Sequence, residues 1–555
     1  MSLKFKLLIA LIMLTSFSFA QIITITDADI GPGQTYNMTA NNTYLLDGYV
    51  FVEDGAVLNI EAGTVIKGKE TPTTNDNCSA LIIAQGGKIF ATGTASDPII
   101  FTAESDDLSI PDDLTFSDRG LWGGILLLGK AIINTTSGIG QVEGIPTTEP
   151  RGAYGGGSTP DDNDNSGVMT YVSVRHGGHE LGAGSGNEIN GITFGAVGSG
   201  TTIDHIEVFA NFDDGYEWFG GTVNTKYLVS AFCADDGFDY DEGFRGMHQF
   251  WFAIKDPIDG GGRMAEQDGG TTPEDGQPYA IPIIYNATYI GPGASSTPQG
   301  DGGEAMIFRD NAGGKYYNSI ITEYNGGNGG VAITVEDLAS GEDSRARLEA
   351  GDLLLRNNIW WQFAAGNDLT SIVPQDFVQT HFTANNNQII DPQLNHISTT
   401  YDAMLDPRPN PSGPASSGTE DPTDPFFDNV DYYGAFNPNA FLWTEGWTAL
   451  SSNGITGVKE KELTNILPGS FDLTQNYPNP FNPSTKIDYS IAEASNVRIA
   501  VYDILGREVE VLVDGFRAAG NYELTFDAED LPSGLYLYTL SAGSTKITKK
   551  MTLLK

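Results

Sequence analysis

The residues of this chain best suited to chemistry are carboxylates in two short acidic segments, each closed by glycine. The first segment reads DDGYEWFGG from Asp213 to Gly221, and the second reads DDGFDYDEG from Asp235 to Gly243. The two segments align with a period of 22 residues, so coils of that length would place Asp213 over Asp235. The strands of neighbouring coils lie only ~4.8 Å apart. Carboxylates at that spacing repel one another unless protons or a cation compensate.

A hard cation with six to eight oxygen ligands would relieve this repulsion, and Ca2+ is the cation that we expect. The stacking would also bring Asp214 over Asp236 and Glu217 over Asp239. The candidate metal ligands are Asp213, Asp214, Asp235, Asp236, Asp239 and Asp241. An alternative stays open, in which these aspartates cap turns through local side-chain hydrogen bonds and point apart.

Aromatic side chains alternate with these carboxylates and suggest a second kind of site. If they are exposed, Tyr216, Trp218 and Tyr240 can stack on the rings of a sugar ligand, with Arg245 as a nearby ligand-binding cation. The alternative is that the aromatic rings form buried ladders between stacked coils.

The same residues also allow an enzymatic interpretation. Hydrolases of polysaccharides use paired carboxylates, whereas lyases combine a base with Arg, Lys or Ca2+ to neutralise a uronate. Asp213, Asp214, Asp235, Asp236 and Arg245 could serve either chemistry. The sequence offers no convincing Gly-His-Gly or Arg-x-Lys companion, so we favour binding over catalysis and assign no catalytic residue.

Two further polar motifs give weaker signals. The run DDNDNSG at 161–167 lacks the glycine at the sixth position and the glutamate at the twelfth position of a calcium loop, which favours a solvated loop. His176 and His179 lie in a glycine-rich stretch, where an ordinary polar turn is favoured over a metal or acid–base site.

The charge of the chain restricts its partners. It has 29 Lys and Arg against 72 Asp and Glu, a formal net charge of -43. Such a surface repels phosphate backbones, which argues against nucleic acid as a partner, and it concentrates cations. A simpler explanation of the acidic charge stays open, namely that it keeps an exported protein soluble. Cys78 and Cys233 are too few for a disulfide framework, and one bridge or two buried thiols remain alternatives.

The N-terminus has the features of a secretory signal peptide. Lys4 and Lys6 precede an apolar run at 7–14, and small residues around Ala20 provide a cleavage site, so we assign residues 1–20 to the signal peptide. No later stretch approaches the ~18 uninterrupted apolar residues that cross a bilayer, so we expect no transmembrane segment in the mature chain.

The elements that must position the acidic segments are many short strands. The 68 glycines are interspersed with β-branched and aromatic runs, and the 22-residue period matches one coil of a parallel β-solenoid. We therefore predict an all-β chain with a solenoid body over residues 21–450. A linker at 451–467 and a small antiparallel β-sandwich at 468–555 follow, the latter indicated by alternating apolar residues and by prolines that suit an edge strand.

The body also resembles known proteins. The segments IEAGTVIKG, ALIIAQGGKIFATGTASDPIIFTAE and WGGILLLGKA are similar to the first coils of right-handed parallel β-helix proteins of the pectin-lyase-like class. NEINGITFGAVGSGTTIDHIEV, the two acidic segments and DYYGAFNPNAFLWTEGWTAL resemble exported proteins common in the Bacteroidota that have no assigned activity. This resemblance implies a right-handed parallel β-helix and says little about function.

The tail resembles a more specific family. FDLTQNYPNPFNPSTKIDYSI, VRIAVYDILGREVEVLV, GNYELTFDAEDLPSGLYLYTL and KKMTLLK are similar, in order, to the type A sorting domain of the type IX secretion system. The resemblance implies that the outer-membrane translocon is the partner of the tail. The protein would pass through this translocon and then be released or attached to the cell surface. We therefore expect a secreted or surface-attached binding or adhesion module, with Ca2+ and a glycan or other surface ligand as its partners.

Overall fold

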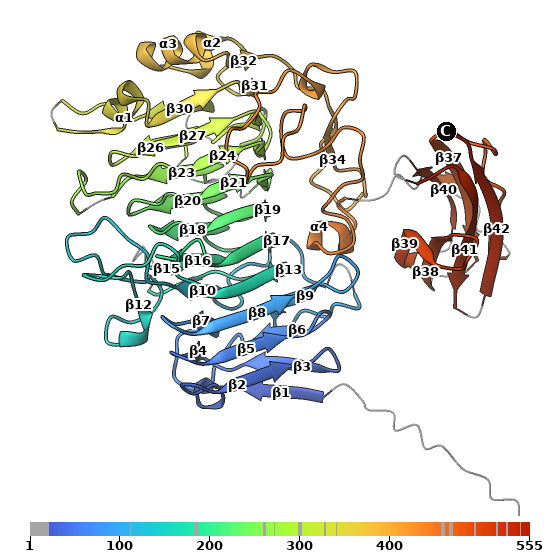
Figure 1. Ribbon diagram of the computed structural model, residues 1–555, viewed down its shortest axis with the longest axis horizontal. Coiled ribbons are helices and arrows are strands. Elements are labelled where there is room, and N and C mark those ends of the chain that lie inside the picture. Colours follow the sequence, from blue (N-terminus) through green and yellow to red (C-terminus); the bar gives the residue numbers. More distant parts are fainter. Residues whose placement is uncertain are drawn as a thin grey trace, which may run out of the picture.

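The computed structural model describes residues 21–555 apart from 111–112, 183–186, 259–261, 271, 298–301, 327–328, 340, 457–460, 465–469, 493–494, 518–519, 529–530 and 544. The expected signal peptide, residues 1–20, lies outside the described residues. The body is a parallel β-helix whose coils stack from β1 upward in Figure 1, and the tail is a separate antiparallel sandwich, as the sequence predicts.

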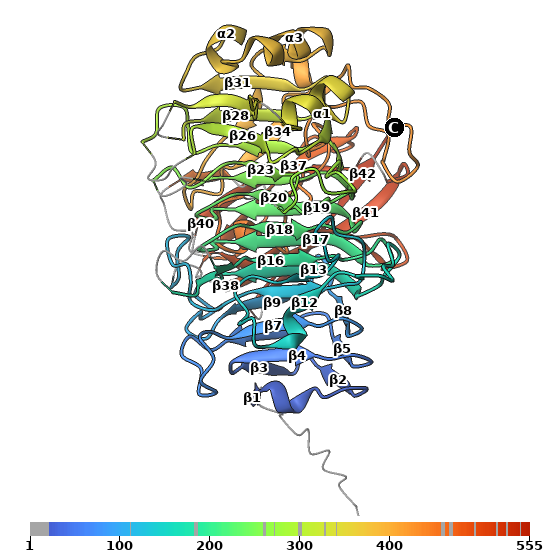
Figure 2. The same cartoon turned by 90° about the vertical axis from the view of Figure 1, so that its left-hand side faces the viewer.

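One wall of the solenoid is a nine-stranded parallel sheet, which we call sheet B. Figure 2 shows most of its strands one above another. Its strands are β4 (Tyr49–Val52), β7 (Ala80–Ile83), β10 (Ile125–Leu128), β16 (Ile192–Gly195), β18 (Tyr216–Phe219), β20 (Phe238–Asp241), β23 (Ala265–Asp268), β26 (Glu304–Arg309) and β29 (Val331–Val335).

The other two walls are columns of parallel strands that merge in the middle of the body. The first column contains β2 (Thr35–Met38), β5 (Val57–Ile60), β8 (Lys88–Thr92), β21 (Met247–Gln249), β24 (Ile283–Tyr285), β27 (Gly314–Tyr317) and β30 (Leu353–Arg356). The second contains β1 (Gln21–Ile25), β3 (Asn42–Leu46), β6 (Val65–Gly68), β9 (Ile99–Ala103), β22 (Phe252–Ile254), β25 (Thr288–Ile290), β28 (Ile320–Tyr324), β31 (Ile359–Phe363) and β32 (Gln388–Ile389). Both columns run through the long strands β13 (Gly167–Arg175), β17 (Thr202–Phe209) and β19 (Asn224–Ala231).

The long strands turn the corner between the two columns at a left-handed residue. Tyr171, His205 and Tyr227 have φ of 50, 53 and 56°, a conformation that costs energy for residues other than glycine. Their rings stack with centroids 4.3 Å apart at each step, and this stacking favours the strained corner. Later coils place asparagine, which tolerates this conformation better, at Asn286, Asn318 and Asn357.

The interior of the solenoid contains stacked aromatic rings, which corrects one prediction from the sequence. Tyr216, Trp218 and Tyr240 are fully buried, because alternate residues of β18 and β20 point into the core. Trp218 stacks on Trp251 with a centroid distance of 5.2 Å and on Phe194 with a centroid distance of 5.4 Å. The prediction that Tyr216, Trp218 and Tyr240 bind a sugar ligand is therefore wrong, and the alternative of a buried aromatic ladder is confirmed.

An excursion at residues 129–165 covers part of the outer face of sheet B. Ile133, Val142 and Tyr154 of this excursion pack on outward side chains such as Phe51 and Leu126. The excursion contains a small antiparallel pair, β11 (Gly140–Gln141) with β12 (Ala153–Tyr154). A second pair, β14 (His179–Glu180) with β15 (Glu188–Ile189), lies beside it, where Asn187 accepts the backbone N–H of Gly144. The excursion therefore leaves this part of the face partly enclosed rather than fully solvated.

Helices close the end of the body opposite β1, as Figure 1 shows. They are α1 (Ser344–Ala350), α2 (Leu369–Ile372) and α3 (Asp376–Ala384), with single turns of 3₁₀ helix elsewhere at η1 (Asp27–Asp29), η2 (Pro150–Gly152) and η3 (Pro414–Ser416). Ile372, Val378 and Phe382 bury their side chains on the last coils, so the apolar interior does not end at an open face.

A covering segment, residues 394–456, packs on the outside of the second column. It contains β33 (Leu394–His396), β34 (Asp406–Pro409) and α4 (Ala449–Ser452), and its Phe436, Trp447 and Leu450 lie against Phe209 and Phe252. The buried carboxylate of Glu207 accepts hydrogen bonds from the backbone N–H groups of Ala449 at 2.6 Å and Leu450 at 3.2 Å. The body therefore extends beyond its predicted end at residue 450.

The tail forms two four-stranded antiparallel sheets with a core of their own. Their strands are β35 (Lys461–Thr464), β36 (Asp472–Leu473), β37 (Ser484–Ile491), β38 (Ser495–Tyr502), β39 (Glu508–Arg517), β40 (Gly520–Asp527), β41 (Gly534–Ala542) and β42 (Thr545–Leu553). The expected linker at 451–467 is corrected at both of its ends. Ile455 and Thr456 still pack within the covering segment, and β35 already pairs with β40.

Candidate metal centre

The two acidic segments stack on each other in the register that their period predicts. β18 pairs with β20 so that Tyr216 lies beside Phe238 and Glu217 beside Asp239. In the turns that precede these strands, the N–H of Asp236 donates to Oδ1 of Asp214 at 2.7 Å. A Cβ at Gly215 would lie 2.8 Å from the carbonyl oxygen of Gly237. The close stacking of the turns therefore requires glycine after each aspartate pair.

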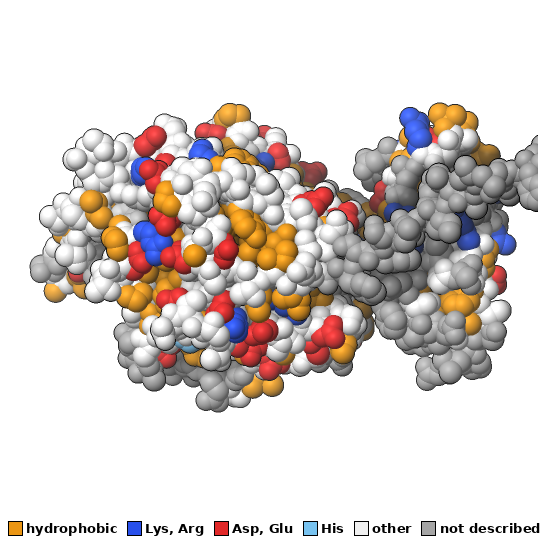
Figure 3. Space-filling view, turned by 90° about the horizontal axis from the view of Figure 1, so that it is seen from below, with side chains coloured by type: hydrophobic (Ala, Val, Ile, Leu, Met, Phe, Trp, Pro, Cys, Tyr) orange, Lys and Arg blue, Asp and Glu red, His pale blue; other side chains and the backbone are white. Residues whose placement is uncertain are grey.

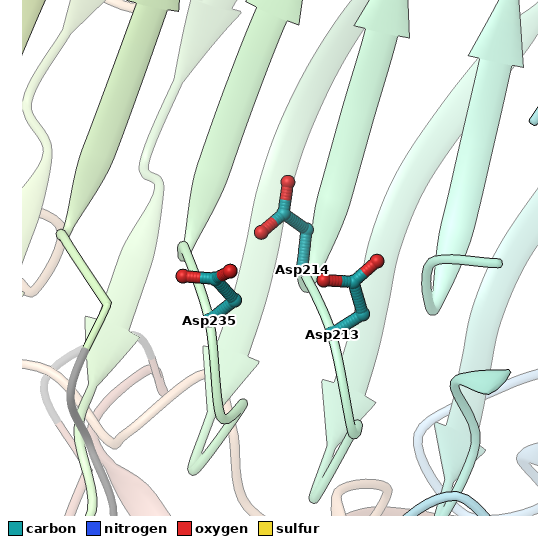
Figure 4. A group of neighbouring side chains, drawn as sticks. All are labelled: Asp213, Asp214 and Asp235. Atoms are coloured by element: carbon teal, nitrogen blue, oxygen red, sulfur yellow. The ribbon is translucent and has the colours of Figure 1, made fainter. Parts of the chain in front are cut away.

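Five carboxylates converge where the two turns meet the strands. One oxygen from each of Asp213, Asp214 and Asp235 lies within 4.8 Å of the others, and the same holds for Asp214, Glu217 and Asp239. Figure 4 shows the first group, with one oxygen of each carboxylate turned toward the space among the three. We call these the edge triad and the face triad, and Asp214 belongs to both.

Burial makes this clustering costly. Asp213, Asp214 and Glu217 are each 8% exposed, and Asp239 is 9% exposed. Burial raises the pKa of each of these carboxyls well above its usual range. Neighbouring carboxylates add to the effect, with Asp213 and Asp236 raising the pKa of Asp214, and Glu143 of the 129–165 excursion raising the pKa of Glu217. Such a site favours either uptake of protons or binding of a cation.

Arginine side chains neutralise the carboxylates on the next coils. Glu266 lies beside Asp239 in the ladder and pairs with both Arg263 and Arg309 at 2.9 Å. Arg309 also pairs with Asp268 at 2.8 Å. Within the part of the chain that the structure describes, no Lys or Arg lies within 4.0 Å of a carboxylate oxygen of Asp213, Asp214, Glu217 or Asp239.

Two of the six predicted metal ligands lie outside both triads. Asp236 accepts the backbone N–H of Arg263, and its carboxylate lies 4.0 Å from the guanidinium of that residue. Asp241 accepts the backbone N–H of Glu242 at 2.5 Å. Burial raises the pKa of both aspartates to about 7. The structure therefore brings together four of the predicted residues and adds Glu217, whose alignment with Asp239 in the repeat is the signal that identifies it.

The remaining polar candidates from the sequence form separate contacts. Arg245 pairs with Asp162 at 3.1 Å, which ties the 161–167 run to the body. Nδ1 of the buried His176 lies 2.6 Å from the carbonyl oxygen of Asp118, whereas His179 lies in β14. Cys78 and Cys233 are both buried free thiols, so the alternative of a disulfide bridge is excluded.

Comparison with known proteins identifies both parts of the chain. Residues 33–396 match the model of the pectate-lyase-like beta helix domain, and residues 475–553 match the model of the secretion system C-terminal sorting domain. No curated protein matches the chain, and no solved structure matches it. Among the described residues, no helix is long and apolar enough to span a membrane.

The match to the first model covers more than half of the chain and agrees with the stacked parallel coils of the body. The match to the second agrees with the antiparallel sandwich of the tail, and this type of tail directs export by the type IX secretion system to the cell surface or the extracellular space. The chain belongs to the pectate-lyase-like β-helix family and is a secreted protein that carries a type IX sorting domain.

Proposed function

We propose that the body is a calcium-binding, surface-displayed binding or adhesion module. The observation that carries this proposal is the convergence of carboxylates at two stacked turns. Within the described residues, no Lys or Arg pairs with Asp213, Asp214, Glu217 or Asp239, whereas the carboxylates of the next coils are paired with arginine. A chain that neutralises one half of an acidic ladder with its own side chains leaves the other half for an external cation.

Calcium fits this donor set better than other common cations. The ligands offered are carboxylate oxygens, which suit hard cations, and the triads contain neither thiolate nor imidazole, which would favour zinc or copper. Ca2+ also accepts irregular coordination, whereas Mg2+ requires a near-ideal octahedron and retains several waters. Extracellular calcium modules commonly bind with dissociation constants of ~10⁻⁴ to 10⁻³ M, which suits an exported protein.

The cation would fasten consecutive coils of the solenoid to each other. Asp213 and Asp214 precede β18, and Asp235 precedes β20, so a single ion in the edge triad contacts two coils. Without a cation, the same contact is repulsive. Binding of Ca2+ therefore stiffens the middle of the body and holds its loops in place for a ligand at the cell surface.

The enclosure and charge of the body favour binding over polysaccharide cleavage. Arg245 is paired with Asp162, so it is already engaged within the protein. Glu217 is buried on a face that the 129–165 excursion partly encloses, which limits access of a polysaccharide chain to the carboxylates. The body also carries acidic side chains on other surfaces, including the face drawn in Figure 3, and these repel a polyuronate.

The test is a thermal melt of the purified protein with millimolar Ca2+ and with EGTA, followed by tryptophan fluorescence. We expect Ca2+ to raise the melting temperature of wild type and of the control variant Asp275→Asn, an exposed acid outside the cluster. Asp214→Asn should show no rise. Equal melting temperatures of wild type in Ca2+ and in EGTA would contradict calcium binding.

A panel of pectic, alginate and other glycans then separates binding from catalysis. We expect some of these glycans, or whole cells, to retain the protein in Ca2+ but not in EGTA. Release of reducing ends or unsaturated products would instead show that the body is an enzyme.

A further inference from the structure

We propose that the acidic cluster binds two cations, one in the edge triad and one in the face triad, with Asp214 shared between them. This inference rests on the proposed calcium site and specifies its stoichiometry and its ligands. The two triads have only Asp214 in common, so a single ion cannot use both complete sets of oxygens at short coordination distances.

The triads differ in their surroundings. The edge triad lies in the turns, and its Asp235 is exposed to solvent. The face triad combines Asp214 with outward side chains from the middle of β18 and β20, and all three of its carboxylates are buried. An ion in the edge triad would therefore retain water ligands and exchange readily, whereas an ion in the face triad would be more enclosed.

An unpartnered atom points independently to a ligand in the face triad. Oδ1 of Asp239 is buried and has no hydrogen-bond partner within the described residues. Buried polar atoms are satisfied in most native structures, and an exception calls for a missing water or ion. The side chain of Asp239 is 9% exposed and converges with Asp214 and Glu217, so a cation among these three would satisfy the orphaned oxygen.

The charge of the cluster also favours more than one divalent ion. Asp213, Asp214, Glu217 and Asp239 carry four negative charges when ionised, so one Ca2+ balances two of them and a second balances the other two. Arg263 and Arg309 bound the cluster on the side of β23, where Arg263 lies 4.0 Å from Asp236 and Arg309 lies 2.8 Å from Asp268. These arginines occupy the next step of the ladder and limit the series to two ions.

The test is the number of Ca2+ ions bound per chain, measured by equilibrium dialysis of the EGTA-stripped protein at pH 8. We expect two ions for wild type and for the control Asp275→Asn. Asp213→Asn should lose the ion of the edge triad, and Asp239→Asn should lose the ion of the face triad, so each should bind one. Asp214→Asn should lose both. Circular dichroism in EGTA checks that every variant is folded, and Glu217→Gln replaces Asp239→Asn if that variant fails to fold.

The outcomes separate this inference from the proposed function. One ion in wild type, lost in both Asp213→Asn and Asp239→Asn, would overturn the two-ion arrangement and leave calcium binding intact. No bound ion in wild type would overturn both. Two ions that persist in all of the cluster variants would place the cations elsewhere and would also refute the inference.

Discussion

Replacement of Asp214 by asparagine should stabilise the protein in the absence of calcium and destabilise it, relative to wild type, in the presence of calcium. Asp214 is the one carboxylate common to both triads, and asparagine keeps its shape while removing its charge. Without calcium, the wild-type cluster is a set of repelling groups, so the variant should be more stable than wild type. With calcium, wild type should gain the binding energy that the variant cannot obtain.

The magnitude follows from the spacing of the carboxylates. The carboxylate oxygens lie within 4.8 Å of one another, and two unit charges at that upper limit interact by roughly 3 kcal/mol at an effective dielectric constant of ~20. We therefore expect Asp214→Asn to raise the free energy of unfolding by about 3 kcal/mol in EGTA at pH 8. At free Ca2+ of ~100 times the dissociation constant, each bound ion stabilises wild type by about 2.7 kcal/mol, or about 5 kcal/mol for two ions.

Urea unfolding followed by tryptophan fluorescence measures this reversal in the body alone. All 7 tryptophans precede the tail, so the signal contains no contribution from the sorting domain. The expected order of urea midpoints is wild type below Asp214→Asn in EGTA, and wild type above Asp214→Asn in Ca2+. Equal destabilisation by Asp214→Asn in both conditions would instead show that Asp214 is an ordinary hydrogen-bonding residue of the turn.

Other predictions concern the core, the covering segment, the pH dependence and the thiols. Trp218→Ala should lower the free energy of unfolding by about 3–5 kcal/mol in urea titrations, because it removes a ring stacked between coils, and a loss below 1 kcal/mol would contradict the packing. Glu207→Gln should cost up to about 3–5 kcal/mol, because it removes one of the two carboxylates, with Asp106, that compensate the buried Arg175. The same variant should also expose residues 440–456 to limited proteolysis. Unchanged cleavage kinetics would show that the hydrogen bonds from Ala449 and Leu450 to Glu207 do not hold this segment in place. In EGTA, the free energy of unfolding should fall as the pH rises from 5 to 8. Burial raises the pKa of Glu143, Glu242 and Asp268 to about 7. The stability that these protonated groups contribute is therefore complete below their unfolded pKa of about 4 and is lost as the pH rises through 7. A rise in the free energy of unfolding between pH 5 and 8 would contradict this prediction. Cys78 and Cys233 should react with a thiol reagent only after unfolding, since both are buried and burial raises the pKa of the Cys78 thiol to about 12, and rapid labelling of the native protein would disprove their burial.

The sequence predicts the stacking of the acidic segments because a repeat carries both a period and a register. Once Gly215 is aligned with Gly237, the pairing of Glu217 with Asp239 follows, and the structure confirms it. The faces to which these side chains point could also be predicted from the sequence. In a strand, Trp218 and Glu217 must point to opposite faces, so a buried tryptophan implies an outward glutamate.

Long-range contacts could not be predicted from the repeat. The bond from Ala449 to Glu207 joins residues 242 positions apart, and no local pattern indicates where the covering segment docks. The same limit applies to Glu143, which the 129–165 excursion brings near Glu217. The helix α3 and the left-handed corner at Tyr171 were missed for a related reason, because packing on neighbouring coils outweighs local backbone preference there.

Anomalous diffraction from a crystal grown in Ca2+, or soaked with a lanthanide that replaces it, would locate the bound cations. We expect two peaks between the turns that precede β18 and β20, one coordinated by Asp213, Asp214 and Asp235 and the other by Asp214, Glu217 and Asp239. Coordination distances of about 2.3–2.6 Å are expected for Ca2+. A map without a peak at either triad, with these carboxylates hydrogen-bonded to the backbone and pointing apart, would contradict this arrangement.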